Sequence, residues 1–302
     1  QKEVHPGQLV TVCIKAVNRH VIFLGKQQFQ IGVAYLNTPG NEKEMLQCDG
    51  VTEKVQQTMA EFSPKHCGIA QIDIEKVFLQ DYLGLIGTQK NFRGGCQLAV
   101  LPEPVLSTRI RTGMEKQQEY RYSAVADDDS DILDLRAFRP GDNLNHIHWN
   151  LSLRTDDLIV RQYGEQIDVK KVILVDLSIL NTAQYRSRMD AVYTAVASIA
   201  NLYVENEVNT LILAWNGQKQ SAEYLEVHDR TELNRAMIRL MQIPCSSRAG
   251  EHAAAVYLKD IEAQGQQALF VTAGSYENNK VRIVNVEKIQ LQELIDELWE
   301  KI

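Results

Sequence analysis

Residues 172–178, Val-Ile-Leu-Val-Asp-Leu-Ser, form the stretch that decides the fold of the C-terminal half. Four consecutive apolar residues predict a strand buried on both faces, which is typical of a parallel sheet covered by helices. In such sheets, ligands bind outside the carboxyl ends of the strands. Asp176 and Ser178 follow this strand directly, so they are the first residues to consider for a site.

Helical and strand patterns alternate from this strand to the end of the chain. Apolar residues recur at spacings of three and four over residues 189–203, and Ser187 with Asp190 has the spacing of an N-terminal cap. Further strands are predicted over residues 210–215, 224–227, 268–272 and 281–286, and further helices from residue 231, over 251–263 and at the C-terminus. This alternation predicts a doubly wound α/β domain over residues 166–302.

The N-terminal third has a different pattern, with short apolar runs separated by turn residues. The runs occupy residues 9–14, 21–24, 29–36 and 72–75, and clusters such as Thr38-Pro39-Gly40-Asn41 lie between them. Such runs predict short strands joined by turns. We therefore expect a small all-β sandwich over residues 1–104, a connecting segment over residues 105–165, and an α+β multi-domain protein.

Composition and charge restrict the function classes. The 302 residues are 44% hydrophobic and 24% charged, the balance of a globular protein with length for about two domains. A net charge of −7 offers no basic stripe for a phosphate backbone, so nucleic acid is not an expected partner. The five cysteines are scattered without Cys-x-x-Cys spacing, and we expect reduced thiols. No run reaches the ~18 apolar residues of a membrane span.

Motifs of common catalytic and ion-binding sites are missing from the sequence. There is no phosphate-binding Gly-x-x-x-x-Gly-Lys, no dinucleotide-binding Gly-x-Gly-x-x-Gly and no Gly-x-Ser-x-Gly nucleophile turn. The acidic run at residues 127–131 is predicted to be a solvated linker. The positions that an EF-hand loop reserves for Gly and Glu hold Ile132 and Phe138 there. The sequence therefore specifies no enzyme.

The segment from Asp134 to Tyr163 combines a tight turn with spaced arginines. It contains Phe138-Arg139-Pro140-Gly141-Asp142, then Trp149, Leu153-Arg154-Thr155 and a strand-like run at 158–163. Together with Lys65-His66-Cys67-Gly68 and the runs at 81–85 and 99–102, this pattern resembles the signature of the bacterial family called domain of unknown function 58. In that family a von Willebrand factor A-like domain follows the signature, so the resemblance implies one here.

The resemblance also implies a cellular setting. Members of the family usually carry a pair of transmembrane helices just upstream of such a region. This chain begins at Gln1 and enters strand-like sequence at once, so we expect a trimmed or processed product. The resemblance implies a bacterial protein of the cell membrane whose soluble region faces the cytoplasm. It further implies a MoxR-type AAA+ ATPase as partner, in the assembly or maturation of envelope complexes.

The strand end at Asp176 is similar to the opening of a metal-ion-dependent adhesion site, in which Asp-x-Ser-x-Ser holds Mg²⁺. Asp176 and Ser178 match this pattern, but Leu180 stands at the third position, and residues 270–275 contain no Asp. We expect Asp176 and Ser178 to hydrogen-bond the loop and the N-terminus of the following helix. The alternative is a degenerate Mg²⁺ site to which Thr182 or Ser275 adds oxygen atoms. No other cofactor is expected.

Two further clusters surround the signature. His146 and His148 could share a metal with Asp142 if their segment is extended, but neighbouring Trp149 favours a packed junction. Arginines are interleaved with aspartates around the turn and are expected to form ion pairs that lock this segment to the α/β domain. The alternative is an anion or partner-docking surface. The arginines are Arg136, Arg139, Arg154 and Arg161, and the aspartates are Asp134, Asp142, Asp156 and Asp157.

The sequence favours a non-enzymatic protein-interaction module. Asp176 and Ser178, with the loops beside them, form the first surface to test for a partner. The alternative is a metal-dependent ligand-binding domain or hydrolase at Asp176 and Ser178, or at the histidine pair. A third possibility is an envelope structural component without an ATPase partner. The residues assigned to the family signature or to partner contact are Arg139, Asp142, His148, Trp149, Arg154 and Arg161.

Overall fold

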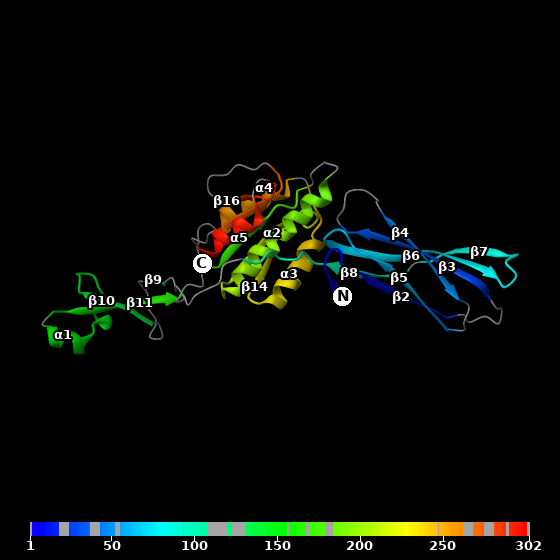
Figure 1. The fold of residues 1–302 in the computed structure, drawn as a ribbon. Helices are drawn as coiled ribbons and strands as arrows, with labels where there is room; N and C mark the ends of the chain where they lie inside the picture. Colours follow the sequence, from blue (N-terminus) through cyan, green and yellow to red (C-terminus); the bar gives the residue numbers. More distant parts are fainter. Residues whose placement is uncertain are drawn as a thin grey trace. The chain divides into compact units, whose positions relative to one another are not determined.

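The protein has a mixed α/β structure, shown in Figure 1 as a computed structural model. The structure describes residues 2–17, 24–36, 43–51, 55–92, 94–107, 120–122, 131–155, 157–166, 170–178, 184–246, 248–261, 268–274, 281–287 and 290–300. The chain divides into two compact units. Residues 1–109 and 170–302 form the first unit, and residues 110–169 form the second.

The C-terminal half of the first unit contains a five-stranded sheet in the order β14-β13-β12-β15-β16. All pairs are parallel except β13 with β14, which is antiparallel at one edge. The predicted strand at 172–175 is the central strand of this sheet. The strands are β12 (Lys171–Val175), β13 (Thr210–Asn216), β14 (Ser221–Val227), β15 (Ala268–Thr272) and β16 (Arg282–Asn285).

Helices cover both faces of this sheet, as its continuous apolar strands require (Figure 1). Ile173 and Val175 share a buried cluster with residues of α2, α3 and α5, whereas Val172 and Leu174 share another with residues of α4. The helices are α2 (Tyr185–Glu205), α3 (Arg230–Gln242), α4 (Ala249–Val256), the π-helical turn η2 (Tyr257–Ile261) and α5 (Leu291–Trp299).

The N-terminal part of the first unit is built from strands. One sheet has the order β1-β8-β6-β3-β4, with β7 paired to β6, and β2 pairs with β5 in a second sheet. Residues of both sheets, including Ile14, Phe29 and Phe62, share one buried cluster. The predicted positions 21–23 and 38–41 lie outside the described residues. The strands are β1 (Lys2–Val4), β2 (Val10–Val17), β3 (Leu24–Tyr35), β4 (Glu44–Val51), β5 (Val55–Phe62), β6 (Gly68–Asp81), β7 (Gly87–Asn91) and β8 (Gly95–Val100).

Asp190 joins the strand-built part to α2, and this role was not predicted. The prediction that Ser187 and Asp190 cap the helix is wrong, because α2 begins earlier, after Gln184, which makes no side-chain cap. The Asp190 carboxylate instead accepts a hydrogen bond from the Cys67 amide at 2.8 Å and lies 2.7 Å from Nδ1 of His66. Burial raises the pKa of this carboxyl and raises that of the Cys67 thiol to about 12.

The second unit contains a three-stranded antiparallel sheet in the order β10-β11-β9. Its strands are β9 (Tyr120–Tyr122), β10 (Asp131–Ala137) and β11 (Ile159–Gln166). A 3-10 turn, η1 (Leu144–His146), and a short helix, α1 (Trp149–Thr155), connect β10 to β11. The acidic residues 127–130 lie outside the described residues. Across both units, no described helix has the length and hydropathy needed to cross a membrane.

Candidate functional site

The carboxylate of Asp176 lies at the carboxyl end of β12 and makes hydrogen bonds with both of its oxygens. Oδ1 accepts from the Ser178 amide at 3.0 Å, and Oδ2 accepts from the Thr272 hydroxyl at 2.6 Å. The Asp176 amide donates to the Val271 carbonyl at 3.0 Å. Asp176 therefore fixes its own loop and the end of neighbouring strand β15.

Ser178 extends this network to the start of α4. Its hydroxyl accepts a hydrogen bond from the Gly250 amide at 3.2 Å, and its backbone forms a parallel bridge with Ser246. Gly250 must be glycine for this approach, because a Cβ there would lie 2.4 Å from Oδ1 of Asp176. Ser178 therefore supports α4, a contact that was not predicted, while residues 179–183, which lead into α2, lie outside the described residues.

The oxygen donors at this edge are suited in type to a hard cation such as Mg²⁺. They are the Asp176 carboxylate and the hydroxyls of Ser178 and Thr272, with the hydroxyl of Ser246 on the bridged strand segment. The Ser246 hydroxyl is buried without a hydrogen-bond partner. Within the described residues, no three His, Cys, Asp or Glu side chains gather in a metal-binding cluster. Leu180, Thr182 and Ser275 lie outside those residues.

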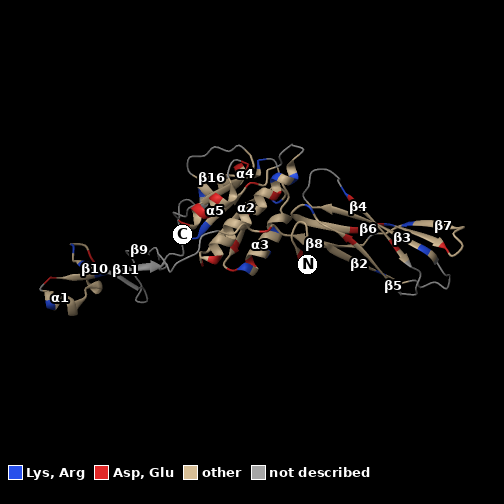
Figure 2. Ribbon diagram, in the orientation of Figure 1, with Lys and Arg blue, Asp and Glu red and all other residues tan. Residues whose placement is uncertain are grey.

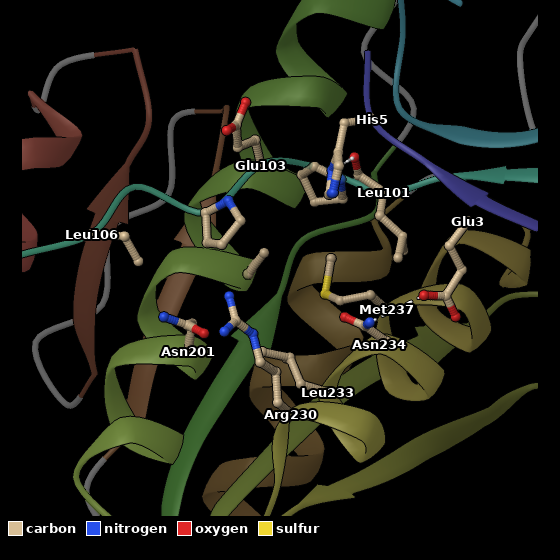
Figure 3. Close-up of a pocket in the computed structure, with 13 residues that line it drawn as sticks. Glu3, His5, Leu101, Glu103, Leu106, Asn201, Arg230, Leu233, Asn234 and Met237 are labelled. Carbon is tan, nitrogen blue, oxygen red and sulfur yellow. Dashed lines mark hydrogen bonds between the residues drawn. The ribbon is translucent and has the colours of Figure 1, made fainter. Parts of the chain in front are cut away.

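A second concave site lies in the first unit, between β1 with the segment after β8 and helices α2 and α3 (Figure 3). Its cavity volume is about 260 Å³. The Asn234 amide donates to the Glu3 carboxylate at 3.1 Å, and Nδ1 of His5 lies 3.0 Å from the Leu101 carbonyl. Arg230 and Glu103 complete a mixed-charge rim over apolar Leu233 and Met237. The sequence analysis missed this cavity because its lining comes from four distant segments.

In the second unit, Asp142 closes the turn of the signature. Its carboxylate pairs with both terminal nitrogens of Arg136 at 2.7 and 2.6 Å, and it also accepts the Arg139 amide at 2.7 Å. The hydrogen bond from Arg136, with that from Arg139, lowers the pKa of the Asp142 carboxyl to about 2. The expected ion pair is present, but it lies within this unit, so the expectation that it locks the segment to the α/β domain is wrong for Arg136.

The two histidines do not occupy an extended segment. His146 ends the turn η1, and His148 precedes α1, where its carbonyl accepts from Leu151 and Ser152 at 3.0 Å each and its Nδ1 lies 3.3 Å from the Leu151 amide. This geometry makes His148 the N-terminal cap of α1. The extended segment assumed for a shared metal site is therefore contradicted.

Trp149 was expected in a packed junction, and the structure contradicts this, since 57% of its surface is exposed. Leu153, one helical turn later, is 80% exposed. Residues four apart lie on the same side of a helix, so these two side chains form one apolar stripe on α1. Arg139 and Arg154 are exposed in the same unit. Nε of Arg161 is buried without a hydrogen-bond partner.

The structure thus separates the predicted site residues into two groups. Asp176 and Ser178 lie at the carboxyl edge of the five-stranded sheet in the first unit, whereas Arg139, Asp142, His148, Trp149, Arg154 and Arg161 lie in the second unit. Thr272 and Gly250 were not predicted from the sequence. Thr272 is the last residue of β15, a buried strand parallel to β12, and that placement at a strand end is the signal that could have found it.

Comparison with known proteins gives one finding about the family. Residues 134–281, close to half of the chain, match the model of the family described as Protein of unknown function DUF58. This match covers both the signature and most of the α/β part, and it supports the assignment of the chain to that family. No curated protein matches the chain.

Asp142 should give the second unit a distinct pH dependence. Its pKa is lowered in the folded state, so its contribution to stability is fully present above the ordinary carboxyl pKa of 3.8 and is lost as the pH falls toward about 2. In a carboxyl ¹³C NMR titration, Asp142 should therefore titrate near pH 2. Asp142→Asn should reduce the pH dependence of unfolding between about pH 4 and 2. A titration near pH 4 for Asp142 would contradict the structure.

Proposed function

We propose that this chain is a non-enzymatic protein-interaction module of a bacterial membrane-associated protein, and that the second unit carries its contact surface. The observation that carries the proposal is the exposed apolar stripe of Trp149 and Leu153 on α1. Neighbouring large apolar side chains that are exposed to solvent mark interaction sites. Trp is also enriched among the residues that dominate binding energy.

The surroundings of this stripe suit a protein partner. Arg139 and Arg154 are exposed in the same unit and can pair with carboxylates at the rim of an interface. The clamp between Arg136 and Asp142 and the cap at His148 hold the turn and the start of α1 in one geometry. A contact surface that is ordered before binding loses less conformational entropy on association.

The nature of the partner is inferred from the family resemblance. Proteins with this signature resemble those that work with a MoxR-type AAA+ ATPase, so we propose such an ATPase as partner, in envelope or complex assembly. We further propose that the N-terminal strands form a β-sandwich and that the C-terminal half is a von Willebrand A-like domain. The order of the five-stranded sheet and the helices on both of its faces support the second assignment.

Affinity capture from membranes of the source bacterium tests this function. The chain as bait should recover an AAA+ ATPase in a nucleotide-dependent manner. The double variant W149A/L153S should reduce recovery roughly tenfold, because it removes two anchors of the interface. Leu9→Ser serves as the matched control, since Leu9 is an exposed leucine in the first unit. Equal recovery by W149A/L153S would contradict the assigned surface, and no ATPase in any sample would favour a purely structural component.

A second candidate function is a metal-dependent ligand-binding domain or hydrolase at the carboxyl edge of the sheet. The observation that favours it is the buried Ser246 hydroxyl without a partner, on a segment bridged to Ser178. Asp176 would hold Mg²⁺ with hydroxyls of Ser178, Ser246 and Thr272, and the ion would supply positive charge to a bound anionic or carbonyl group. The single carboxylate, with both oxygens already accepting hydrogen bonds, makes this the weaker proposal.

Calorimetric titration with Mg²⁺ or Mn²⁺ distinguishes the two functions. A metal site should bind about one equivalent of the ion, and Ser178→Ala should abolish that binding. Ser178→Ala is chosen because it is a smaller change than removal of the Asp176 carboxylate. The interaction-module proposal predicts no saturable binding. Stoichiometric binding that Ser178→Ala abolishes would transfer the assignment to the metal site.

A further inference from the structure

The loop between β6 and β7 presents four large apolar side chains to solvent. Tyr82, Leu83, Leu85 and Ile86 are 73–82% exposed and stand within five consecutive residues, interrupted only by Gly84. Gly84 has a φ of 73°, which allows the chain to reverse direction between the two pairs of side chains. Figure 1 shows this loop at the free end of the β6–β7 hairpin. A cluster of this kind on an exposed loop marks an interaction site.

The backbone of this loop is closed by its own hydrogen bonds. The Asp81 amide donates to the Ile86 carbonyl at 2.9 Å, and the Gly84 amide donates to the Asp81 carbonyl at 3.1 Å. The Asp81 carboxylate accepts from the Ile86 amide at 2.8 Å, and the Gln80 side chain donates to the Gly84 carbonyl at 3.1 Å. Internal pairing of backbone groups is what a segment needs to enter a hydrocarbon phase, where water cannot replace those bonds.

The tip of the loop is uncharged, as entry into a bilayer requires. Residues 82–89 carry no charge (Figure 2), and in the sequence Asp81 precedes them and Lys90 follows them. Lys26 on β3 pairs in register with Gln80, just behind the loop, and its ammonium lies 3.4 Å from the Asp49 carboxylate. The charges of Lys26 and Lys90 at the base of the hairpin are thus matched by those of Asp49 and Asp81, and the tip itself is apolar. Lys90 lies three residues beyond the first residue of β7, about 10 Å from the loop, which places it at headgroup depth when the apolar tip enters the acyl region.

The shape of the loop favours a bilayer over a protein partner. Four side chains on five residues are a small area compared with the roughly 800 Å² that a stable protein interface buries on each side. None of the four packs substantially on the rest of the chain, since each is at least 73% exposed. A fluid acyl phase accepts side chains that point in several directions, whereas a protein partner needs a complementary pocket. Tyr82 can keep its hydroxyl at the interface while its ring is buried.

We propose that the β6–β7 loop inserts its apolar tip into a phospholipid bilayer, with Lys90 at the headgroups. This contact belongs to the first unit and is independent of the partner surface proposed on α1. The tip is also distant from the end of β6 that begins at Gly68, because a strand of 14 residues spans roughly 40 Å. The unit can therefore touch a membrane while its α/β part remains clear of the surface.

Cosedimentation with vesicles tests this contact directly. The chain should bind vesicles of phosphatidylcholine alone, and also vesicles of phosphatidylcholine and phosphatidylglycerol at 3:1. L83S/L85S should reduce the partition coefficient by roughly tenfold or more, because each leucine contributes through the apolar surface that it buries. Leu9→Ser is the control, as an exposed leucine away from the tip. Leu83 and Leu85 are exposed, so the circular dichroism spectrum of L83S/L85S should match that of the wild type.

If the β6–β7 loop contacts a second copy of the chain instead of a bilayer, sedimentation experiments will show it. Sedimentation velocity of the chain alone should show no self-association that L83S/L85S removes. A dimer lost in that variant would assign the tip to a second copy of the chain and overturn the proposal. Vesicle binding that is absent, or equal in wild type and L83S/L85S, would overturn it as well. None of these outcomes depends on recovery of an ATPase, so the two proposals fail separately.

Discussion

The hydrogen bonds of the Asp176 carboxylate organise the carboxyl edge of the central sheet. One oxygen receives the Ser178 amide and the other receives the Thr272 hydroxyl, so a single side chain joins the ends of β12 and β15. Ser178 then receives the amide of Gly250 and positions the first turn of α4. The close approach of Gly250 leaves no room for a side chain there. The edge at which α/β sheets commonly bind ligands is here a connected structural network.

Because hydrogen bonds within the protein occupy this sheet edge, the candidate contact surfaces lie elsewhere in the chain. The α1 stripe of Trp149 and Leu153 belongs to the second unit, and the apolar loop at residues 82–86 belongs to the first. Both expose side chains that proteins normally bury, and both stand on backbone held by specific hydrogen bonds. The clamp at Asp142 supports one surface, and the Asp81 carboxylate supports the other. Each unit thus carries one exposed apolar surface on an ordered backbone.

The sequence predicted the regular elements of the α/β part well because their signal is local. The apolar run at 172–175 became the central strand, and the stripe at 189–203 became part of α2. The functional side chains depended on distant contacts that no local pattern contains. Asp190 has the spacing of a cap, yet it bonds to His66 and Cys67 from another part of the chain. Trp149 lies in an apolar-looking segment, but whether a short helix buries its tryptophan depends on neighbours that sequence does not reveal.

Asp176 acts as a structural residue, and its contribution to the free energy of unfolding is the measurement that tests this role. Equilibrium denaturation in a buffer containing a chelator would compare Asp176→Ala with Asp49→Ala, a control at an exposed surface pair. Asp176→Ala should lower the free energy of unfolding by about 2–4 kcal/mol, because two hydrogen bonds to a charged acceptor are lost. Unchanged or higher stability without metal would contradict it, since a carboxylate kept only for a cation is not needed in the metal-free protein.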